Sequence, residues 1–155
     1  MISMVVLGHG QFGTGLQAAM LQIIGPQENV AFLNFTESKS PAELKDEIES
    51  ALDDMGRDDG VLFCCDILGG TPFRTASTVA HTLDTVEVIA GANLQMVIEC
   101  AMEKDGLSFP ELVDLAVESG TRGIVKLSDE LAKKNKAAPT TKTTASNAKC
   151  GHTAL

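Results

Sequence analysis

Residues 4–20 read MVVLGHGQFGTGLQAAM: a short apolar run, a glycine-rich turn, then apolar residues at helical spacing. This order is typical of a buried parallel strand that leads directly into a helix. Gly8, Gly10 and Gly13 also match the G-x-G-x-x-G pattern of dinucleotide-binding domains. His9 lies inside the same turn, where the flanking glycines leave its ring open to approach. The stretch therefore raises two hypotheses, a dinucleotide site and a site whose chemistry belongs to His9.

The alternation of strand and helix continues along the chain. Apolar runs predict further strands over residues 30–35, 61–67, 86–90 and 123–127. Helical spacing, prolines and N-cap residues predict helices over residues 14–24, 41–55, 73–83, 93–103 and 110–118. Because the two kinds of element alternate, we expect an α/β fold: a flavodoxin-like, open, mostly parallel five-stranded sheet with helices on both faces.

Composition limits the classes of partner. The chain has 155 residues, 44% of them hydrophobic, which suits one globular domain with its own core. Its formal net charge is −9, and it contains neither Trp nor Tyr. A negative surface without aromatic stacking platforms argues against nucleic acid and against an anionic membrane surface. Proteins or small molecules are the expected partners.

Two further expectations concern location and boundaries. The apolar runs are too short to span a bilayer and the start of the chain lacks a secretory pattern, so we expect a cytoplasmic protein. Periodicity disappears from about Lys133 onward. We therefore expect a domain over residues 1–132, followed by a flexible tail or linker over residues 133–155.

The four cysteines do not form a metal-binding pattern. Cys64 and Cys65 are adjacent, Cys100 lies in a predicted helix and Cys150 in the predicted tail, with no C-x-x-C. Buried reduced thiols are the expected state. We expect neither a metal nor a cofactor.

A second motif follows the third predicted strand, in the stretch FCCDILGGTPF over residues 63–73. Asp66 ends the apolar run. The backbone amides of Gly69, Gly70 and Thr71 then precede a helix that begins around a proline. Free amides at a helix N-terminus favour an anion, so this loop is a candidate phosphate-binding site.

The two motifs are expected to meet. In the common doubly wound strand order 2-1-3-4-5, the first and third strands are neighbours, and ligands bind beyond the carboxyl ends of the strands. Asp66 would then accept a hydrogen bond from the Nδ1–H group of His9 and leave Nε2 as a nucleophile. The Gly69, Gly70 and Thr71 amides, with the Thr71 hydroxyl, would hold a phosphoryl group without a metal.

Together, GHGQFGTG and DILGGTPF resemble the enzyme IIA component of the mannose-type bacterial sugar phosphotransferase system, and the similar layout covers residues 1–132. The resemblance implies that His9 accepts a phosphoryl group from the carrier HPr. It would pass the group to a IIB component, which phosphorylates a sugar during import through membrane components IIC and IID. It also implies that Asp66 is the hydrogen-bonding partner of His9 and that Thr71 stands where the family more often has Ser.

The same resemblance implies a homodimer in which the last strand pairs across subunits. Some members of the family are fused to IIB through an Ala/Pro-rich linker. The segment over residues 133–155 is similar to such a linker, so we expect either that IIB is a separate chain or that the segment is simply a terminal tail. Whether IIB is a separate chain stays open.

Several alternatives remain at this stage. A small Rossmann-like module would bind a pyrophosphate at the glycine turn and a ribose at Glu37. The phosphotransfer subunit of a dihydroxyacetone kinase system uses a related module. A receiver or flavin-binding module would need an acidic cluster or an aromatic pair, and neither is present. His9 alone would be a structural histidine. For Arg74 there are two interpretations, a contact with phosphate or a partner and a place on a solvated helix face, and the second is expected.

Overall fold

The computed structural model describes residues 1–137, and the chain divides into two compact units, Met1–Gly123 and Ile124–Leu155. The first unit contains a sheet of four parallel strands, β1 (Ser3–His9), β2 (Val30–Phe35), β3 (Val61–Cys65) and β4 (Val86–Ala90). Their order across the sheet is β2-β1-β3-β4. The sequence-based prediction of a parallel α/β sheet with the first and third strands adjacent is confirmed.

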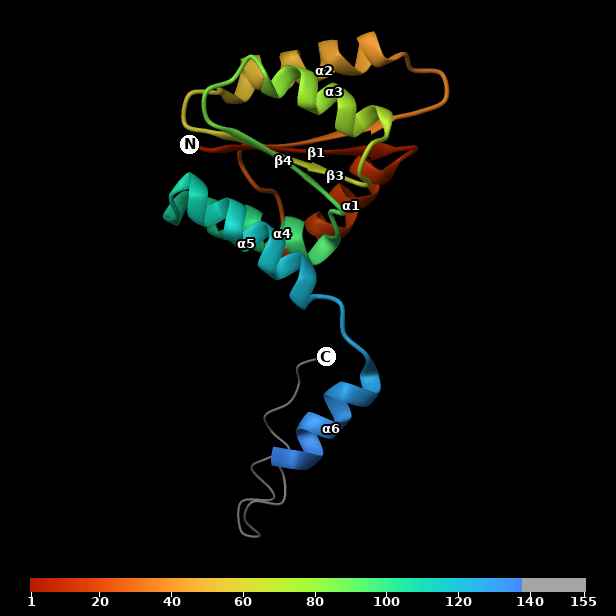
Figure 1. Cartoon of the computed structure of the whole chain (residues 1–155), viewed down its shortest axis with the longest axis vertical. Helices are drawn as coiled ribbons and strands as arrows, with labels where there is room; N and C mark the ends of the chain where they lie inside the picture. Colours follow the sequence, from red (N-terminus) through yellow and green to blue (C-terminus); the bar gives the residue numbers. More distant parts are fainter. Residues whose placement is uncertain (138–155) are drawn as a thin grey trace. The chain divides into compact units, whose positions relative to one another are not determined.

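Five helices cover the two faces of this sheet. Figure 1 shows α2 (Pro41–Met55) and α3 (Thr71–Ala80) on one face, and α1 (Phe12–Ile24), α4 (Leu94–Glu103) and α5 (Phe109–Arg122) on the other. A short 3-10 helix, η1 (Lys104–Gly106), joins α4 to α5. Each strand therefore has apolar neighbours on both sides, as the short uninterrupted apolar runs in the sequence require.

The core has two layers because successive side chains of a strand point to opposite faces. Met4 and Val6 of β1 pack with the layer under α1, α4 and α5. Val5 and Leu7 pack with the layer under α2 and α3. All four side chains are fully buried. The central strand β1 is thus held from both faces, and its last residue is fixed in position.

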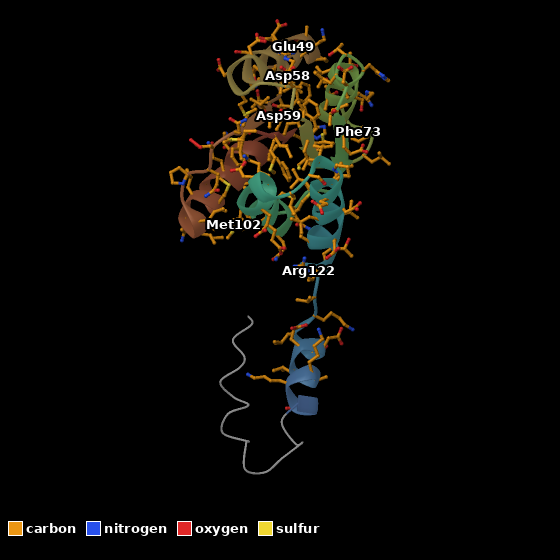
Figure 2. The ribbon with its side chains drawn as sticks, turned by 90° about the vertical axis from the view of Figure 1, so that its left-hand side faces the viewer. Glu49, Asp58, Asp59, Phe73, Met102 and Arg122 are labelled. Atoms are coloured by element: carbon orange, nitrogen blue, oxygen red, sulfur yellow. The ribbon has the colours of Figure 1, made fainter. Side chains whose placement is uncertain are left out.

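Local signals set the helix ends. Ser40 accepts a hydrogen bond from the Glu43 amide, and the Glu43 carboxylate accepts one from the Ser40 amide, so the two residues form a capping box at the start of α2. Asn93 caps α4 through a bond from the Met96 amide. Arg122, labelled in Figure 2, lies in the last turn of α5 and pairs with Glu99 of α4 at 2.7 Å.

The predicted fifth strand over residues 123–127 is wrong. Gly123 is the C-cap of α5, residues 124–126 have no regular structure, and α6 (Leu127–Ala137) begins directly afterwards. Ile124 and Val125 are 78% and 56% exposed. A strand is stabilised by a hydrogen-bonded neighbour, and within residues 1–137 this apolar run has none, so the sheet has four strands rather than five.

The structure bears on two predicted boundaries, those of the helix over residues 73–83 and the start of the tail. The helix predicted over residues 73–83 extends from Thr71 to Ala80 in the structure. It begins earlier because Pro72 is accommodated in its first turn, and it ends earlier, with His81 as the C-cap. Of the predicted tail, residues 133–137 belong to α6, and residues 138–155 lie outside the described part of the chain. No helix within residues 1–137 is long and apolar enough to cross a membrane.

Candidate functional site

The two residues singled out by the sequence motifs lie side by side. His9 is the last residue of β1, and Asp66 is the first residue after β3. The Nδ1 atom of His9 lies 2.7 Å from Oδ2 of Asp66, and the backbone amide of His9 donates a hydrogen bond to the same oxygen at 2.8 Å. The predicted meeting of an imidazole and a carboxylate at the carboxyl ends of neighbouring strands is therefore present in the structure.

The Asp66 carboxylate is held in its charged form. Its side chain is only 13% exposed. Burial alone would raise its pKa, but hydrogen bonds from the His9 amide, the His9 ring and the Ile67 amide together hold the pKa below the ordinary value. A charged carboxylate can only accept hydrogen bonds.

The state of the His9 ring follows from this. Because Asp66 accepts, the Nδ1 atom of His9 carries the proton, and in the neutral ring Nε2 is left with its lone pair. The His9 side chain is 46% exposed. The arrangement offers an oriented nitrogen nucleophile that a partner can reach from solvent, with a fixed negative charge behind it to stabilise a positive imidazolium.

Small and aromatic neighbours set the position of this pair. At Gly8, a Cβ atom would lie 2.8 Å from Cγ of Asp66 and 2.6 Å from the ring of Phe12, so only glycine lets the carboxylate approach the strand end. On the other side, the rings of His9 and Phe35 meet edge to face with their centroids 6.0 Å apart. The imidazole is thus confined between its neighbours while about half of the His9 side chain remains exposed.

The glycine loop packs against the reactive ring. Gly70 is the N-cap of α3, and a Cβ atom on it would lie 2.6 Å from Cε1 and 3.1 Å from Nε2 of His9. Gly69 has φ +85°, a left-handed conformation that favours glycine. Thr71 begins α3, whose N-terminus has no side-chain cap. The loop predicted to bind phosphate therefore lies next to Nε2, at the positive end of a helix.

The glycines that match the dinucleotide pattern have another explanation. At Gly13, in the first turn of α1, a Cβ atom would lie 2.3 Å from the backbone oxygen of Leu33. This glycine lets α1 pack closely on β2. Gly10 adopts φ +58° and its amide donates to the carbonyl of Phe35 at 2.8 Å, so it shapes the turn after His9. Packing and turn geometry account for both residues without a bound dinucleotide.

Metal and thiol chemistry receive no support at this site. Within residues 1–137, no group of three or more His, Cys, Asp or Glu side chains is placed to hold a metal ion. Cys64, Cys65 and Cys100 are buried. Burial raises the pKa of the Cys65 and Cys100 thiols to about 12 and that of Cys64 well above its ordinary value. These thiols are core residues rather than nucleophiles.

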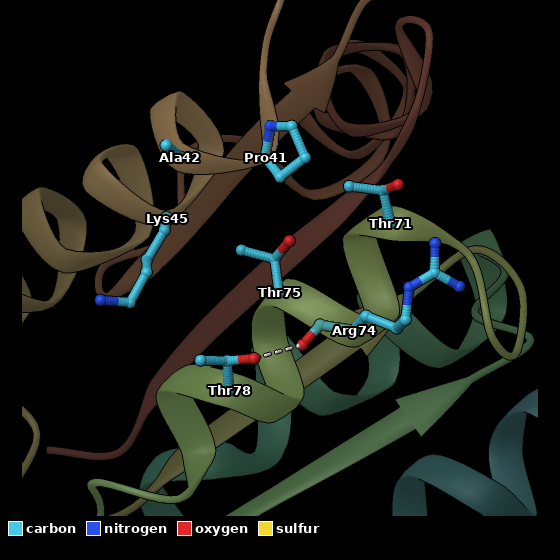
Figure 3. A pocket seen from close by; sticks show the side chains of 7 residues that line it. All are labelled: Pro41, Ala42, Lys45, Thr71, Arg74, Thr75 and Thr78. Atoms are coloured by element: carbon cyan, nitrogen blue, oxygen red, sulfur yellow. Dashed lines mark hydrogen bonds between the residues drawn. The ribbon is translucent and has the colours of Figure 1, made fainter.

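Sequence reasoning singled out Arg74 but not its contact with the loop. Arg74 is exposed, as expected for a solvated helix face, and its Nη1 atom donates a hydrogen bond to the carbonyl oxygen of Gly69. It also lines a hollow of about 320 Å³ between α2 and α3 (Figure 3). No sequence pattern signals such a contact, since it joins a helical side chain to a loop carbonyl.

Comparison with known proteins places this chain among the sugar phosphotransferase system components. The chain belongs to the EIIA-man family, described as the PTS system fructose IIA component, whose model matches residues 3–117. The resemblance predicted from the two sequence motifs is therefore confirmed, and the dinucleotide-binding and dihydroxyacetone kinase alternatives are not favoured.

Two relatives illustrate the similarity. The chain is 35% identical over 139 residues to the PTS system mannose-specific EIIAB component of Escherichia coli, covering 89% of this chain and 43% of that protein. It is 29% identical over 114 residues to the PTS system fructose-specific EIIA component of Bacillus subtilis, covering 74% and 78% of the two chains. The chain thus spans less than half the length of the E. coli relative.

Solved structures of sugar phosphotransferase system components have a similar fold. The phosphotransferase system component EIIA from Streptococcus agalactiae superimposes with a TM-score of 0.76 at 30% identity, covering 83% of this chain and 99% of that one. The mannose/sorbose specific IIA subunit from Enterococcus faecalis, at 23% identity, shares the fold with a TM-score of 0.72 and covers 81% and 93% of the two chains.

Proposed function

We propose that this chain is a phosphocarrier of a mannose-type sugar phosphotransferase system. His9 accepts a phosphoryl group from phospho-HPr and passes it to a IIB component, which phosphorylates the sugar during uptake. The observation that carries the proposal is the hydrogen bond from Nδ1 of His9 to Asp66, which leaves the lone pair on the other ring nitrogen, beside Gly70, in a side chain that is 46% exposed.

The chemical step follows from this geometry. Nε2 of His9 attacks the phosphorus atom, and the new N–P bond forms as the N–P bond on the donor phosphohistidine breaks. The ring gains positive charge while Nδ1 keeps its proton, and the ionised Asp66 carboxylate stabilises that charge. Transfer onward to IIB is the reverse of this step at His9, so no metal and no cofactor is consumed.

The loop after Asp66 supplies the counterpart for the phosphoryl oxygens. We assign phosphate binding to the amides of Gly69, Gly70 and Thr71 and to the Thr71 hydroxyl. Support comes from the close approach of Gly70 to the ring and from the uncapped N-terminus of α3. The negative charge that develops during transfer would meet donors already fixed in place.

The surface around His9 suits a protein donor rather than a small molecule. Ile67 and Leu68, directly after Asp66, are 56% and 75% exposed. Apolar side chains of this kind beside an exposed nucleophile fit a protein interface. We propose HPr and IIB as direct partners, membrane components IIC and IID as indirect ones, and a homodimer acting in the cytoplasm, with the activity carried by residues 1–132.

The test is phosphorylation of the purified protein with HPr, its phosphorylating enzyme and phosphoenolpyruvate. We expect one acid-labile phosphate on the wild type and none on His9→Ala. His81→Ala is the matched control: His81 is exposed at the end of α3, so the His81→Ala protein should still be phosphorylated normally on His9. An unlabelled wild type, or full labelling of His9→Ala, would overturn the proposal.

A further inference from the structure

The guanidinium of Arg74 is joined to the glycine loop. Arg74 lies in the first turn of α3, where side chains lean back toward the helix N-terminus. Its Nη1 atom donates to the carbonyl oxygen of Gly69, five residues earlier, and its backbone amide donates to the carbonyl oxygen of Gly70 at 2.9 Å. One residue therefore binds both glycine carbonyls of the loop that packs against His9.

The Gly69 bond has a consequence for the next amide. A peptide unit is planar and trans, so its carbonyl and its N–H group point in opposite directions. By holding the carbonyl of Gly69, the guanidinium of Arg74 also fixes the direction of the Gly70 N–H group. That amide belongs to Gly70, on which a Cβ atom would lie 2.6 Å from Cε1 and 3.1 Å from Nε2 of His9.

Little else at Gly69 restrains this peptide. Gly69 has φ +85°, and no atom from the rest of the protein lies within 4 Å of where its Cβ would be. A glycine in open space has many accessible backbone conformations. The Arg74 hydrogen bond selects one of them.

We propose that Arg74 is a positioning residue for phosphotransfer, which orients the Gly69–Gly70 peptide so that the Gly70 amide is preset to receive a phosphoryl oxygen. This inference rests on the proposed function. The cost of reorienting the amide is met during folding rather than during transfer, so the donor is in place when charge develops on the phosphoryl group. In a chain of net charge −9, the guanidinium also brings a positive charge to the loop beside the Asp66 carboxylate.

Lys45 provides a matched comparison. It lines the same hollow between α2 and α3, but Figure 3 shows its ammonium at the opposite end, away from the arginine guanidinium and from Thr71. Removing Lys45 changes the charge of the region by the same amount as removing Arg74. It leaves the hydrogen bond to Gly69 intact.

The experiment measures two quantities in Arg74→Ala, Arg74→Lys and Lys45→Ala. The first is the single-turnover rate of phosphoryl transfer from phospho-HPr; the second is the NMR signal and hydrogen-exchange rate of the Gly70 amide in the unphosphorylated protein. The free energy of one charge-assisted hydrogen bond corresponds to a change of about tenfold in rate. We therefore expect the rate of phosphoryl transfer in Arg74→Ala to fall by about tenfold. Its Gly70 amide should shift and exchange faster. Arg74→Lys should recover most of the rate, and Lys45→Ala should match the wild type.

The outcomes separate the two proposals. An unchanged Gly70 amide in Arg74→Ala, a wild-type transfer rate in that variant, or equal slowing by Arg74→Ala and Lys45→Ala would each overturn the positioning role. If the wild type itself accepts no phosphoryl group, the proposed function fails. The amide measurement, made without phosphorylation, then still tests the restraint on the loop.

Discussion

Asp66 binds His9 at two points through a single oxygen atom. Oδ2 accepts one hydrogen bond from the backbone of His9 at 2.8 Å and one from its ring at 2.7 Å, while Oδ1 accepts from the amide of Ile67. The carboxylate therefore has donors on both oxygens. It joins the ends of β1 and β3 and fixes the tautomer of the imidazole at the same time.

Replacement of Asp66 by Asn should slow phosphoryl transfer strongly. An amide has only one acceptor atom, so its NH₂ group would face either the Ile67 amide or the two donors of His9. By analogy with other histidines that depend on a carboxylate, we expect a loss of roughly 100-fold or more, measured by rapid quench. Asp84→Asn, an exposed aspartate before β4, serves as the control. Wild-type kinetics in the Asp66 variant would remove this carboxylate from the mechanism.

The contribution of Asp66 to stability should depend on pH. Its pKa is lowered in the folded protein because the hydrogen bonds from His9 and Ile67 outweigh the effect of burial. The unfolded chain, with an ordinary Asp pKa of about 3.9, then binds the proton first as pH falls. The stabilisation is complete above that value and is lost as pH falls through the lower folded pKa.

Urea unfolding of the wild type and Asp66→Asn between neutral and acidic pH measures this contribution. The difference in free energy of unfolding should be constant above the ordinary Asp pKa and should shrink below it. The other carboxylates are present in both proteins, so their contributions cancel in the difference between the two free energies of unfolding. A difference that stays unchanged into the acid range would contradict the assignment.

Alanine substitutions at Gly69 and Gly70 should affect different properties, one mainly the stability and the other mainly the rate of phosphoryl transfer. At Gly70, the new Cβ atom would lie 2.6 Å from Cε1 of His9, so the ring or the loop must move and transfer should fall sharply. At Gly69, the space is open but φ is +85°, so the cost, about 1 kcal/mol, should appear mainly in the free energy of unfolding. Transfer rates and thermal melts of the two variants measure the contrast. Equal losses of transfer would show that the approach of Gly70 to the ring is unimportant.

Gly13→Ala should destabilise the fold, because close packing rather than nucleotide binding explains this glycine. Its Cβ would lie 2.3 Å from the backbone oxygen of Leu33, and neither helix nor strand can yield cheaply, so we expect a loss of about 2 kcal/mol or more. Gly15→Ala, in the same helix but in open space, should be neutral or slightly stabilising. Urea denaturation distinguishes them. A Gly13→Ala protein as stable as the wild type would contradict the packing explanation.

Leu68→Ser should weaken the encounter with phospho-HPr. The side chain is 75% exposed next to the site, so its loss should raise KM by several-fold and leave kcat and the thermal melt nearly unchanged. Met102→Ser is the control. Met102 is 57% exposed near the C-terminal end of α4 (Figure 2), outside the elements that carry His9, Asp66 and the glycine loop. A similar rise in KM for both variants would indicate a nonspecific effect.

Much of this arrangement could be predicted from the sequence because its signals are local. The runs around Val5 and Phe63 are apolar throughout, as buried parallel strands require, and Ser40 with Pro41 is a strong start signal for a helix. Once the first and third strands are taken as neighbours, the meeting of His9 with Asp66 follows from where each strand ends.

The failures have physical causes too. The run GIVKL has strand-like composition, but strand formation depends on a partner that no local pattern specifies, and Ile124 is exposed in a segment leading to α6. The contact between Arg74 and Gly69 depends on the curvature of a loop whose left-handed glycine is invisible to periodicity. Such features are decided by tertiary geometry.

His9 ends β1 and Asp66 directly follows β3, and these are the inner strands of the sheet, each flanked on both sides by another strand. Local opening of a protein begins at chain termini and mobile loops, and core strands separate only in global unfolding. The geometry of the histidine and its carboxylate should therefore persist for as long as the native state does. Thermal inactivation and denaturation of this carrier would then be the same event.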